Sequence, residues 1–244
     1  MVHRRPDAAL ILRCHPLAVF SGRQTGKSHQ MKATQAIHDL GQSIWLDNIT
    51  RDLLDSGTLG RYVDELSVTG LTSNPTIFNH AIEGSTAYDS AIRDRSRSGQ
   101  TVEALFVELA IEDLTRAADL FRPVYDRTAR VDGWVSLEVS PLLAHDTTAT
   151  VISARQLHAL AGRSNLFIKI PGTKEGVAAI EEAIFAGVPV NVTLLFSREQ
   201  YVAAADAYLR GIERRHRRRP PADRKFCRLV VHQPLGCGGD GQSA

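Results

Sequence analysis

Five short, almost wholly apolar segments alternate with helix-forming stretches through the middle of this chain. They span residues 43–48, 67–75, 134–141, 166–171 and 188–197. A strand followed by a helix and another strand must cross over the sheet, which makes neighbouring strands parallel. Strands that are apolar on both faces belong to sheets that are covered on both sides. The alternation therefore predicts an α/β fold with five βα units, either as an open sheet or as part of a barrel.

The stretches between these segments follow the spacing of amphipathic helices. The clearest helix lies in residues 101–121, where apolar side chains recur along one face. Residues 49–66 predict two shorter helices divided at Gly57. Thr147 or Thr148 is expected to cap the helix that precedes the fourth strand.

A lysine stands inside the fourth apolar segment, NLFIKIPGTKEG, as residue 169. At the edge of a sheet, such a lysine packs its stem and keeps its ammonium group in water. In a poorly hydrated cavity it loses its proton more easily and becomes a free amine, which attacks a carbonyl to form a Schiff base. The segment alone allows both interpretations.

Polar side chains also stand in, or directly after, the other apolar segments. Six residues share this position: Asp47, Asn74, Glu138, Lys169, Asn191 and Thr193. Taken singly, Asp47 can cap the next helix and Asn74 can form an Asx-turn before Pro75. Glu138 can pair with an arginine, and Thr193 favours strands in general. Together they are costly to bury unless they face one shared polar site, and catalytic groups of α/β barrels cluster at the carboxyl ends of strands. The six residues predict an active site and favour the Schiff-base interpretation.

Length and charge describe one domain with two unusual ends. A chain of 244 residues can bury one sizeable core, and a single α/β barrel fits this length. Residues 1–32 and 214–244 carry net charges of +5 and +6, whereas residues 33–213 have 15 basic and 24 acidic residues, a net charge of −9. The three cysteines have neither CxxC nor metal-ligand spacing, which indicates a reducing compartment.

Two segments near the amino end imitate functional signals without matching them. Residues 8–20 resemble a signal peptide, but Arg13 and Pro16 interrupt the apolar run. Residues 21–28, SGRQTGKS, have Ser21 where the Walker pattern requires glycine. No apolar run is long enough to span a membrane. We therefore expect a cytoplasmic protein that binds neither a membrane nor a nucleotide.

Five stretches of the chain resemble the transaldolase family, in the family's order and at plausible spacing. They are SIWLDNITRDLL, GLTSNPTIF, WVSLEVSP, NLFIKIPGT and VPVNVTLLFS. The resemblance covers roughly residues 33–213 and is strongest to the bacterial branch with a long helical insertion after the second strand. It implies a TIM-type (β/α)8 barrel, of which about five βα units are recognisable here.

The resemblance also implies an activity and catalytic residues. The family transfers a dihydroxyacetone unit by a ping-pong reaction, converting sedoheptulose 7-phosphate and glyceraldehyde 3-phosphate to erythrose 4-phosphate and fructose 6-phosphate. Lys169 corresponds to the Schiff-base lysine, and Asp47 to the carboxyl group that moves the proton of the hydroxyl at the cleaved carbon–carbon bond. Glu138 and Thr193 correspond to the groups that orient a water for Schiff-base formation and hydrolysis.

Substrate binding is assigned by the same resemblance. Asn74 and Asn191 correspond to residues that hydrogen-bond the hydroxyls of the three-carbon unit, and we add Thr72 to them. The implied partners are sugar phosphates. No metal or cofactor is expected, because a protonated imine is itself the electron sink and no His/Cys/carboxylate cluster has ligand spacing.

Both ends depart from the family pattern. After the fifth helix the family continues with a strand bearing a serine, and then an arginine, which bind the substrate phosphate; two more strands close the barrel. Residues 215–244 contain no match to either residue, and we expect a basic, disordered, out-of-frame or aberrant tail in place of the last three units. Residues 1–32 are expected to be a disordered extension, which leaves residues 33–214 as the barrel portion. Its open sheet edge predicts poor solubility.

Other functions stay open at this point. One is a different Schiff-base aldolase for sugar phosphates, and another is an inactive remnant with an unclosed barrel. The basic run RRHRRR at residues 214–219 raises a third, nonspecific binding of nucleic acid. The run lacks interleaved aromatic residues and any recognisable module, so we expect no nucleic-acid partner.

Overall fold

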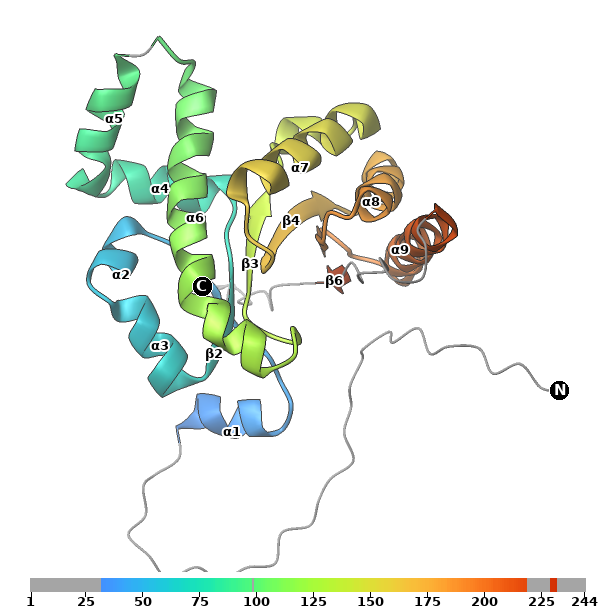
Figure 1. Cartoon of the computed structure of the whole chain (residues 1–244), viewed down its shortest axis with the longest axis horizontal. Coiled ribbons are helices and arrows are strands. Elements are labelled where there is room, and N and C mark those ends of the chain that lie inside the picture. The colour runs from blue at the N-terminus through green and yellow to red at the C-terminus, as the bar shows by residue number, and fades with distance from the viewer. Residues whose placement is uncertain (1–31, 98, 219–228, 232–244) are drawn as a thin grey trace, which may run out of the picture.

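The computed structural model describes residues 32–97, 99–218 and 229–231 (Figure 1). The extension expected over residues 1–32 lies outside this range except for its last residue. The elements are α1 (Ala33–Asp39), β1 (Ile44–Asp47), α2 (Arg51–Asp55), α3 (Thr58–Leu66), β2 (Val68–Thr72), α4 (Pro75–Glu83), η1 (Thr86–Tyr88), α5 (Asp89–Ser96), α6 (Val102–Arg127), β3 (Trp134–Glu138), η2 (Pro141–Leu143), α7 (Thr147–Ala161), β4 (Leu166–Pro171), α8 (Lys174–Ala186), β5 (Val190–Thr193), α9 (Arg198–Arg218) and β6 (Leu229–Val231). In the described part of the chain, no helix is long and apolar enough to cross a membrane.

The described strands form one six-stranded sheet in which sequence order and spatial order are the same. Every neighbouring pair is parallel. The sheet curls, and α7, α8 and α9 follow one another along its outside (Figure 1). The α/β class and the incomplete TIM-type barrel with five βα units are thereby confirmed. Strand β6 adds a sixth parallel strand within the residues expected to form a tail.

One face of the sheet packs against the helices and forms the main core. Alternate strand residues such as Leu71, Val135, Ile168 and Val192 are wholly buried there. The helices meet them largely through alanines, among them Ala117, Ala154, Ala179, Ala183 and Ala204. Small side chains let a helix lie close over a sheet of branched residues, so the face is dense and apolar. The other residues of each strand face the interior of the curl.

The interior face has two layers. Towards the amino ends of the strands, the rings of Trp134 and Phe167 stack with centroids 3.9 Å apart, and Trp45 stacks on Phe167 at 6.4 Å. Gly70 makes room for this aromatic layer, because a Cβ at that position would lie 2.5 Å from the Trp45 ring. The polar residues predicted as a site lie in the second layer, towards the carboxyl ends of the strands.

The helices start close to the predicted positions, but the caps considered from sequence for α2 and α7 are not the ones observed. Gly57 separates α2 from α3 and has a positive φ of 68°. Thr50, and not Asp47, caps α2 by accepting a hydrogen bond from the N–H of Leu53. The prediction of a threonine cap on α7 is wrong. Asp146 is the cap, because its carboxylate accepts the N–H of Ala149 at 2.9 Å.

Helix α9 extends four residues beyond the predicted boundary at residue 214. It starts with a capping box, in which Gln200 and Ser197 exchange side-chain and backbone hydrogen bonds. Near its end, Arg214 contacts Glu181 at 2.7 Å and Glu182 at 2.6 Å on α8. A count of charge along the chain cannot reveal these contacts between helices, which stabilise α9 where the basic run begins.

A helical insertion, α4–α6, lies between β2 and β3 and is tied to the first βα unit by a buried polar cluster. Arg51, at the start of α2, places Nε and Nη2 at 3.0 and 2.9 Å from Asp113 Oδ1. The Tyr88 hydroxyl donates to Asp113 Oδ2 at 2.8 Å and accepts the backbone N–H of Arg51 at 3.0 Å. All three side chains are buried, so each depends on the others for the hydrogen bonds that water would otherwise supply.

This cluster makes a prediction about stability. Asp113→Ala removes the carboxylate closest to the buried Arg51 charge and leaves only the half-exposed Glu112, 3.4 Å from Nη2, as its partner. We expect a loss of about 3–5 kcal/mol of unfolding free energy. The control is Asp119→Ala, since Asp119 pairs with Arg163 at the surface and such pairs contribute roughly 0–1 kcal/mol. Urea unfolding of both variants measures the difference. Equal losses would show that the buried cluster does not tie the insertion to the sheet.

Candidate active site

The polar residues predicted from the sequence converge on the interior face of the sheet. In the strand register, Glu138 is the neighbour of Lys169, and Lys169 is the neighbour of Asn191. On the other side, Asp47 pairs with Thr72. Thr193 follows Asn191 by two residues and therefore faces the same side. These residues from five strands line one surface near the carboxyl ends of the strands.

Lys169 lies in the middle of the sheet, so the interpretation as an edge residue is wrong. The residue is 7% exposed, and its strand is flanked by β3 and β5. Its Nζ lies 3.1 Å from Glu138 Oε2 and donates to the backbone carbonyl of Ser73 at 3.4 Å. A buried ammonium group requires such partners. Glu138 thus pairs with this lysine and not with an arginine.

Glu138 is in an environment that disfavours its charge. Burial raises the pKa of its carboxyl above the ordinary value, and the neighbouring Lys169 lowers it in part. The charge of Asp47 raises the pKa of Glu138 further, which shows that the two carboxylates share one electrostatic environment. Asp47 itself is exposed at the end of β1. The arrangement places the Lys169 amine beside a carboxyl group whose pKa lies above its ordinary value.

The side chain of Asn191, on β5, is held by a hydrogen bond to β3. Its Nδ2 donates to the hydroxyl of Ser136 at 3.0 Å, and both residues are wholly buried. The Oδ1 of Asn191 has no hydrogen-bond partner among the described residues, and the same is true of the buried Oγ1 of Thr72. Unsatisfied buried oxygens are costly, and at an interior surface they are suited to a donor from a ligand.

Asn74 has a structural function in addition to any contact with substrate. It lies just beyond β2, and its Oδ1 accepts the N–H of Ile77 at 2.9 Å, which makes it the cap of α4. The structure therefore shows a helix cap and not the Asx-turn considered from sequence. This hydrogen bond engages the amide oxygen and leaves the amide nitrogen as the group available to a substrate.

Sequence reasoning missed Ser73 and Ser136. Ser73 donates from its hydroxyl to the backbone carbonyl of Ser136 at 2.8 Å, and its own carbonyl contacts Lys169. A signal for Ser136 existed, because it stands two residues before Glu138 and so shares its face of the strand. Ser73 follows β2 and had no such periodic signal.

The turn after β4 holds the lysine strand against its helix. Thr173 caps α8 by accepting the N–H of Gly176 at 3.0 Å. A Cβ on Gly176 would lie 1.9 Å from the carbonyl oxygen of Pro171, so glycine is required for α8 to begin this close to β4. The segment PGTKEG is therefore a compact connection that positions the strand carrying Lys169.

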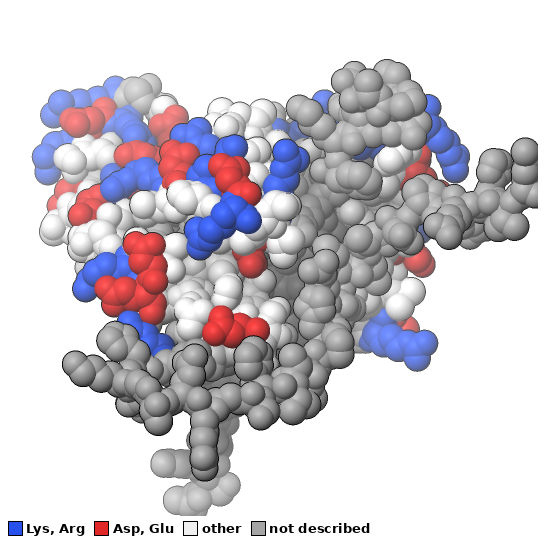
Figure 2. All heavy atoms as spheres, turned by 60° about the horizontal axis from the view of Figure 1, so that its bottom comes forward, with Lys and Arg blue, Asp and Glu red and all other residues white. Residues whose placement is uncertain are grey.

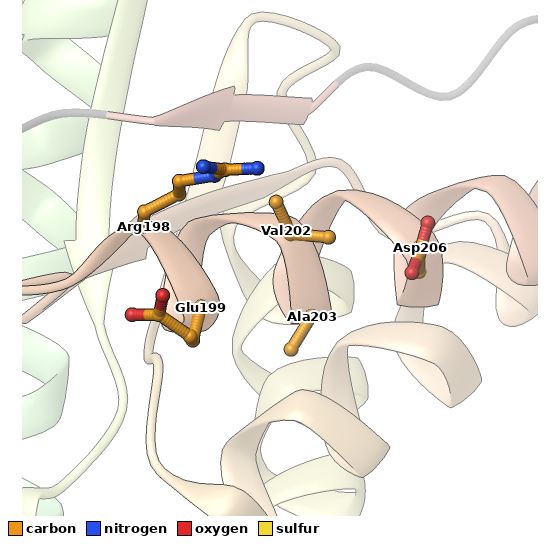
Figure 3. Close-up of a pocket in the computed structure, with 5 residues that line it drawn as sticks. All are labelled: Arg198, Glu199, Val202, Ala203 and Asp206. Carbon is orange, nitrogen blue, oxygen red and sulfur yellow. The ribbon is translucent and has the colours of Figure 1, made fainter.

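A hollow of about 480 Å³ lies elsewhere, along α9. It is lined by Arg198, Glu199, Val202, Ala203 and Asp206. Figure 3 shows Arg198 and Val202 on one side of the helix and Glu199 and Ala203 on another. None of the residues that line the hollow belongs to the interior polar surface. Because the residues predicted as a site converge on that surface, we place the candidate site there and not in the hollow. Within the described ranges, no group of three or more His, Cys, Asp or Glu residues is arranged to hold a metal ion.

Comparisons with known proteins find similar sequences over most of the chain. The family model described as transaldolase/fructose-6-phosphate aldolase matches residues 44–227. Transaldolase 2 of Nostoc punctiforme is 48% identical over 179 residues, which are 73% of this chain and 47% of that protein. A transaldolase of Thiobacillus denitrificans is 47% identical over 185 residues, 76% of this chain and 52% of the relative. The chain spans about half the length of the curated relatives that it matches.

The contact between Glu138 and Lys169 makes a prediction about pH. Lys169→Met removes both interactions that lower the pKa of Glu138, so that pKa rises further, as a ¹³C NMR titration of the carboxyl would measure. The folded protein then keeps this proton at pH values where the unfolded chain has lost it. The free energy of unfolding therefore increases as the pH falls through the folded-state pKa of Glu138. Because this pKa is higher in Lys169→Met, the increase begins at a higher pH in the variant than in the unmodified chain. Lys174→Met, in α8, is the control and should leave the titration unchanged.

Proposed function

This chain belongs to the transaldolase/fructose-6-phosphate aldolase family, and we propose that it transfers a dihydroxyacetone unit between sugar phosphates through a Schiff base on Lys169. The observation that supports this most directly is the buried Nζ of Lys169, 3.1 Å from the Glu138 carboxylate. A nucleophilic lysine needs a desolvated position and a nearby group that exchanges protons with it, and the burial of Lys169 and its contact with Glu138 support both. The proposed substrates are sedoheptulose 7-phosphate and glyceraldehyde 3-phosphate, and the proposed products are erythrose 4-phosphate and fructose 6-phosphate, as the family resemblance implies.

The first step is formation of the imine. The free amine of Lys169 attacks the ketose carbonyl, and the resulting carbinolamine loses water to give a protonated imine. Glu138 is the nearest carboxyl group, and its raised pKa allows it to take the proton from the amine and return one to the departing hydroxyl. We propose that Thr193, on the same face, orients the water of this step.

The second step is cleavage of the carbon–carbon bond. We propose that Asp47 takes the proton from the hydroxyl at the bond to be cleaved, so that this carbon leaves as an aldehyde. The electron pair of the broken bond enters the protonated imine and forms a neutral enamine. Asp47 is exposed at the end of β1, where it can reach a substrate that enters from the carboxyl ends of the strands.

The remaining steps return the enzyme to its initial state. The enamine carbon attacks the carbonyl of the acceptor aldehyde, and Asp47 returns its proton to the new alkoxide. Water then adds to the imine and releases the ketose and the free amine. We propose that Asn74, Asn191 and Thr72 hold the hydroxyls of the three-carbon unit throughout. The unpartnered oxygens of Asn191 and Thr72 support this proposal.

Binding of nucleic acid is less well supported than catalysis. In the basic run, Arg214 contacts two glutamates of α8, and Arg217 lies 3.6 Å from Glu213. On the face shown in Figure 2, basic and acidic side chains are interspersed and do not form a patch of one sign. A surface that binds phosphate backbones concentrates free basic groups.

We include a cytoplasmic location in the proposal because the three cysteines lack disulfide-like spacing.

Trapping of the Schiff base tests this function. The full chain, incubated with fructose 6-phosphate and borohydride, should gain a covalent three-carbon adduct on Lys169, located by peptide mass spectrometry. Lys169→Ala should lose the adduct and all transfer activity in a coupled assay, whereas Lys174→Ala should retain both. Glu138→Gln should slow adduct formation by roughly 10²–10⁴-fold, the usual contribution of a general acid–base group.

The same experiment separates the alternatives. Adduct formation with release of glyceraldehyde 3-phosphate, but without transfer to erythrose 4-phosphate, would indicate a simple aldolase. A folded chain that forms no adduct at Lys169 would indicate an inactive relative and would falsify the proposed function. Circular dichroism of each variant distinguishes this result from loss of folding.

A further inference from the structure

One hydrogen bond crosses the interior face of β4 just below Lys169. Ser136, on β3, is the register neighbour of Phe167, and Asn191, on β5, is the register neighbour of Lys169. Strand β4 lies between β3 and β5, so the 3.0 Å bond from Asn191 Nδ2 to Ser136 Oγ passes over it between Phe167 and Lys169. The bond therefore lies between the aromatic layer and the polar site.

This bond determines which end of the Asn191 amide is available. A primary amide has a donor end and an acceptor end on one rigid plane. With the nitrogen directed to Ser136, Oδ1 is buried and has no hydrogen-bond partner among the described residues. Leaving such an oxygen unpaired costs stability unless a ligand provides a donor. A substrate hydroxyl is such a donor.

Ser136 is itself fixed by the residues around the lysine. The hydroxyl of Ser73 donates to the backbone carbonyl of Ser136 at 2.8 Å, and the carbonyl of Ser73 accepts from Lys169 Nζ. Ser73, Ser136 and Asn191 are all buried. A single set of contacts therefore links the end of β2, the middle of β3, the amine on β4 and the amide on β5.

We propose that Ser136 is a positioning residue, which holds the Asn191 amide so that it offers only its oxygen to a hydroxyl of the three-carbon unit. The proposal rests on the function proposed for the Lys169 site. Without Ser136, the amide is free to turn its nitrogen towards the substrate, and a hydroxyl that donates to Oδ1 loses its acceptor. Ser136 has no direct contact with substrate in this proposal and acts through Asn191.

Kinetics of a double-mutant cycle test the proposal. Ser136→Ala should raise KM for fructose 6-phosphate about 2- to 12-fold, the equivalent of one hydrogen bond, with a smaller change in kcat. In an Asn191→Ala background, Ser136→Ala should have no further effect on KM, because its target is gone. Thr150→Val is the matched control. It removes a buried hydroxyl on α7 that donates to the backbone carbonyl of Leu143 in η2, and neither residue contacts Ser136 or Asn191, so KM should be unchanged.

A second measurement does not depend on catalysis. In Lys169→Met, where no Schiff base forms, the Asn191 side-chain amide can be followed by ¹⁵N NMR while dihydroxyacetone is added. One Nδ2 proton should exchange slowly with solvent, and Ser136→Ala should remove this protection and weaken dihydroxyacetone binding about 2- to 12-fold. Thr150→Val should do neither.

The outcomes separate this inference from the proposed function. If Lys169 forms no adduct but the amide protection and dihydroxyacetone affinity depend on Ser136, the function fails and the positioning role stands. If the adduct forms and Ser136→Ala changes neither KM nor amide exchange, the positioning role is overturned and the function stands. The positioning role would also be overturned if the effects of Ser136→Ala and Asn191→Ala on KM were additive, or if no binding of dihydroxyacetone could be detected.

Discussion

The contact between Lys169 and Glu138 is the interaction on which the proposed chemistry depends. A charged or nucleophilic amine is stable in the interior only if a neighbouring group compensates for the lost water. Glu138 does so at 3.1 Å, and the parallel register of β3 and β4 sets that distance by making the two residues neighbours. The carboxylate is in turn destabilised by burial and by Asp47. The charge of each group is thus compensated by the other, which allows both to be buried on the same interior surface.

The alternation of strands and helices was predictable from sequence because it rests on periodicity, which local residues specify. The five strands, the division of the first helix pair at Gly57 and the placement of Lys169 among apolar residues all follow from it. The convergence of Asp47, Glu138 and Asn191 was also predictable, since the carboxyl ends of parallel strands meet at one edge. The roles assigned to these residues in catalysis remain predictions.

What sequence could not predict depends on contacts between distant segments. The bond from Asn191 to Ser136 joins residues 55 positions apart, and neither residue type marks it. The continuation of α9 depends on arginine–glutamate pairs with α8, whereas a count of charge along the chain separates the basic end from the acidic middle. The cap of α7 was misassigned because Asp146 and Thr147 are adjacent and both residue types favour that position. Strand β6 is only three residues long and depends on pairing with β5.

The aromatic layer below the lysine has a practical consequence. The chain contains two tryptophans, and both lie in this layer, in ring contact with Phe167. Tryptophan fluorescence of the protein therefore originates one residue layer away from the Lys169 amine, with no contribution from the helices. Emission wavelength and quenching report directly on the hydration of this interior, so spectroscopy without any added label can follow whether ligands or solvent enter the curl of the sheet.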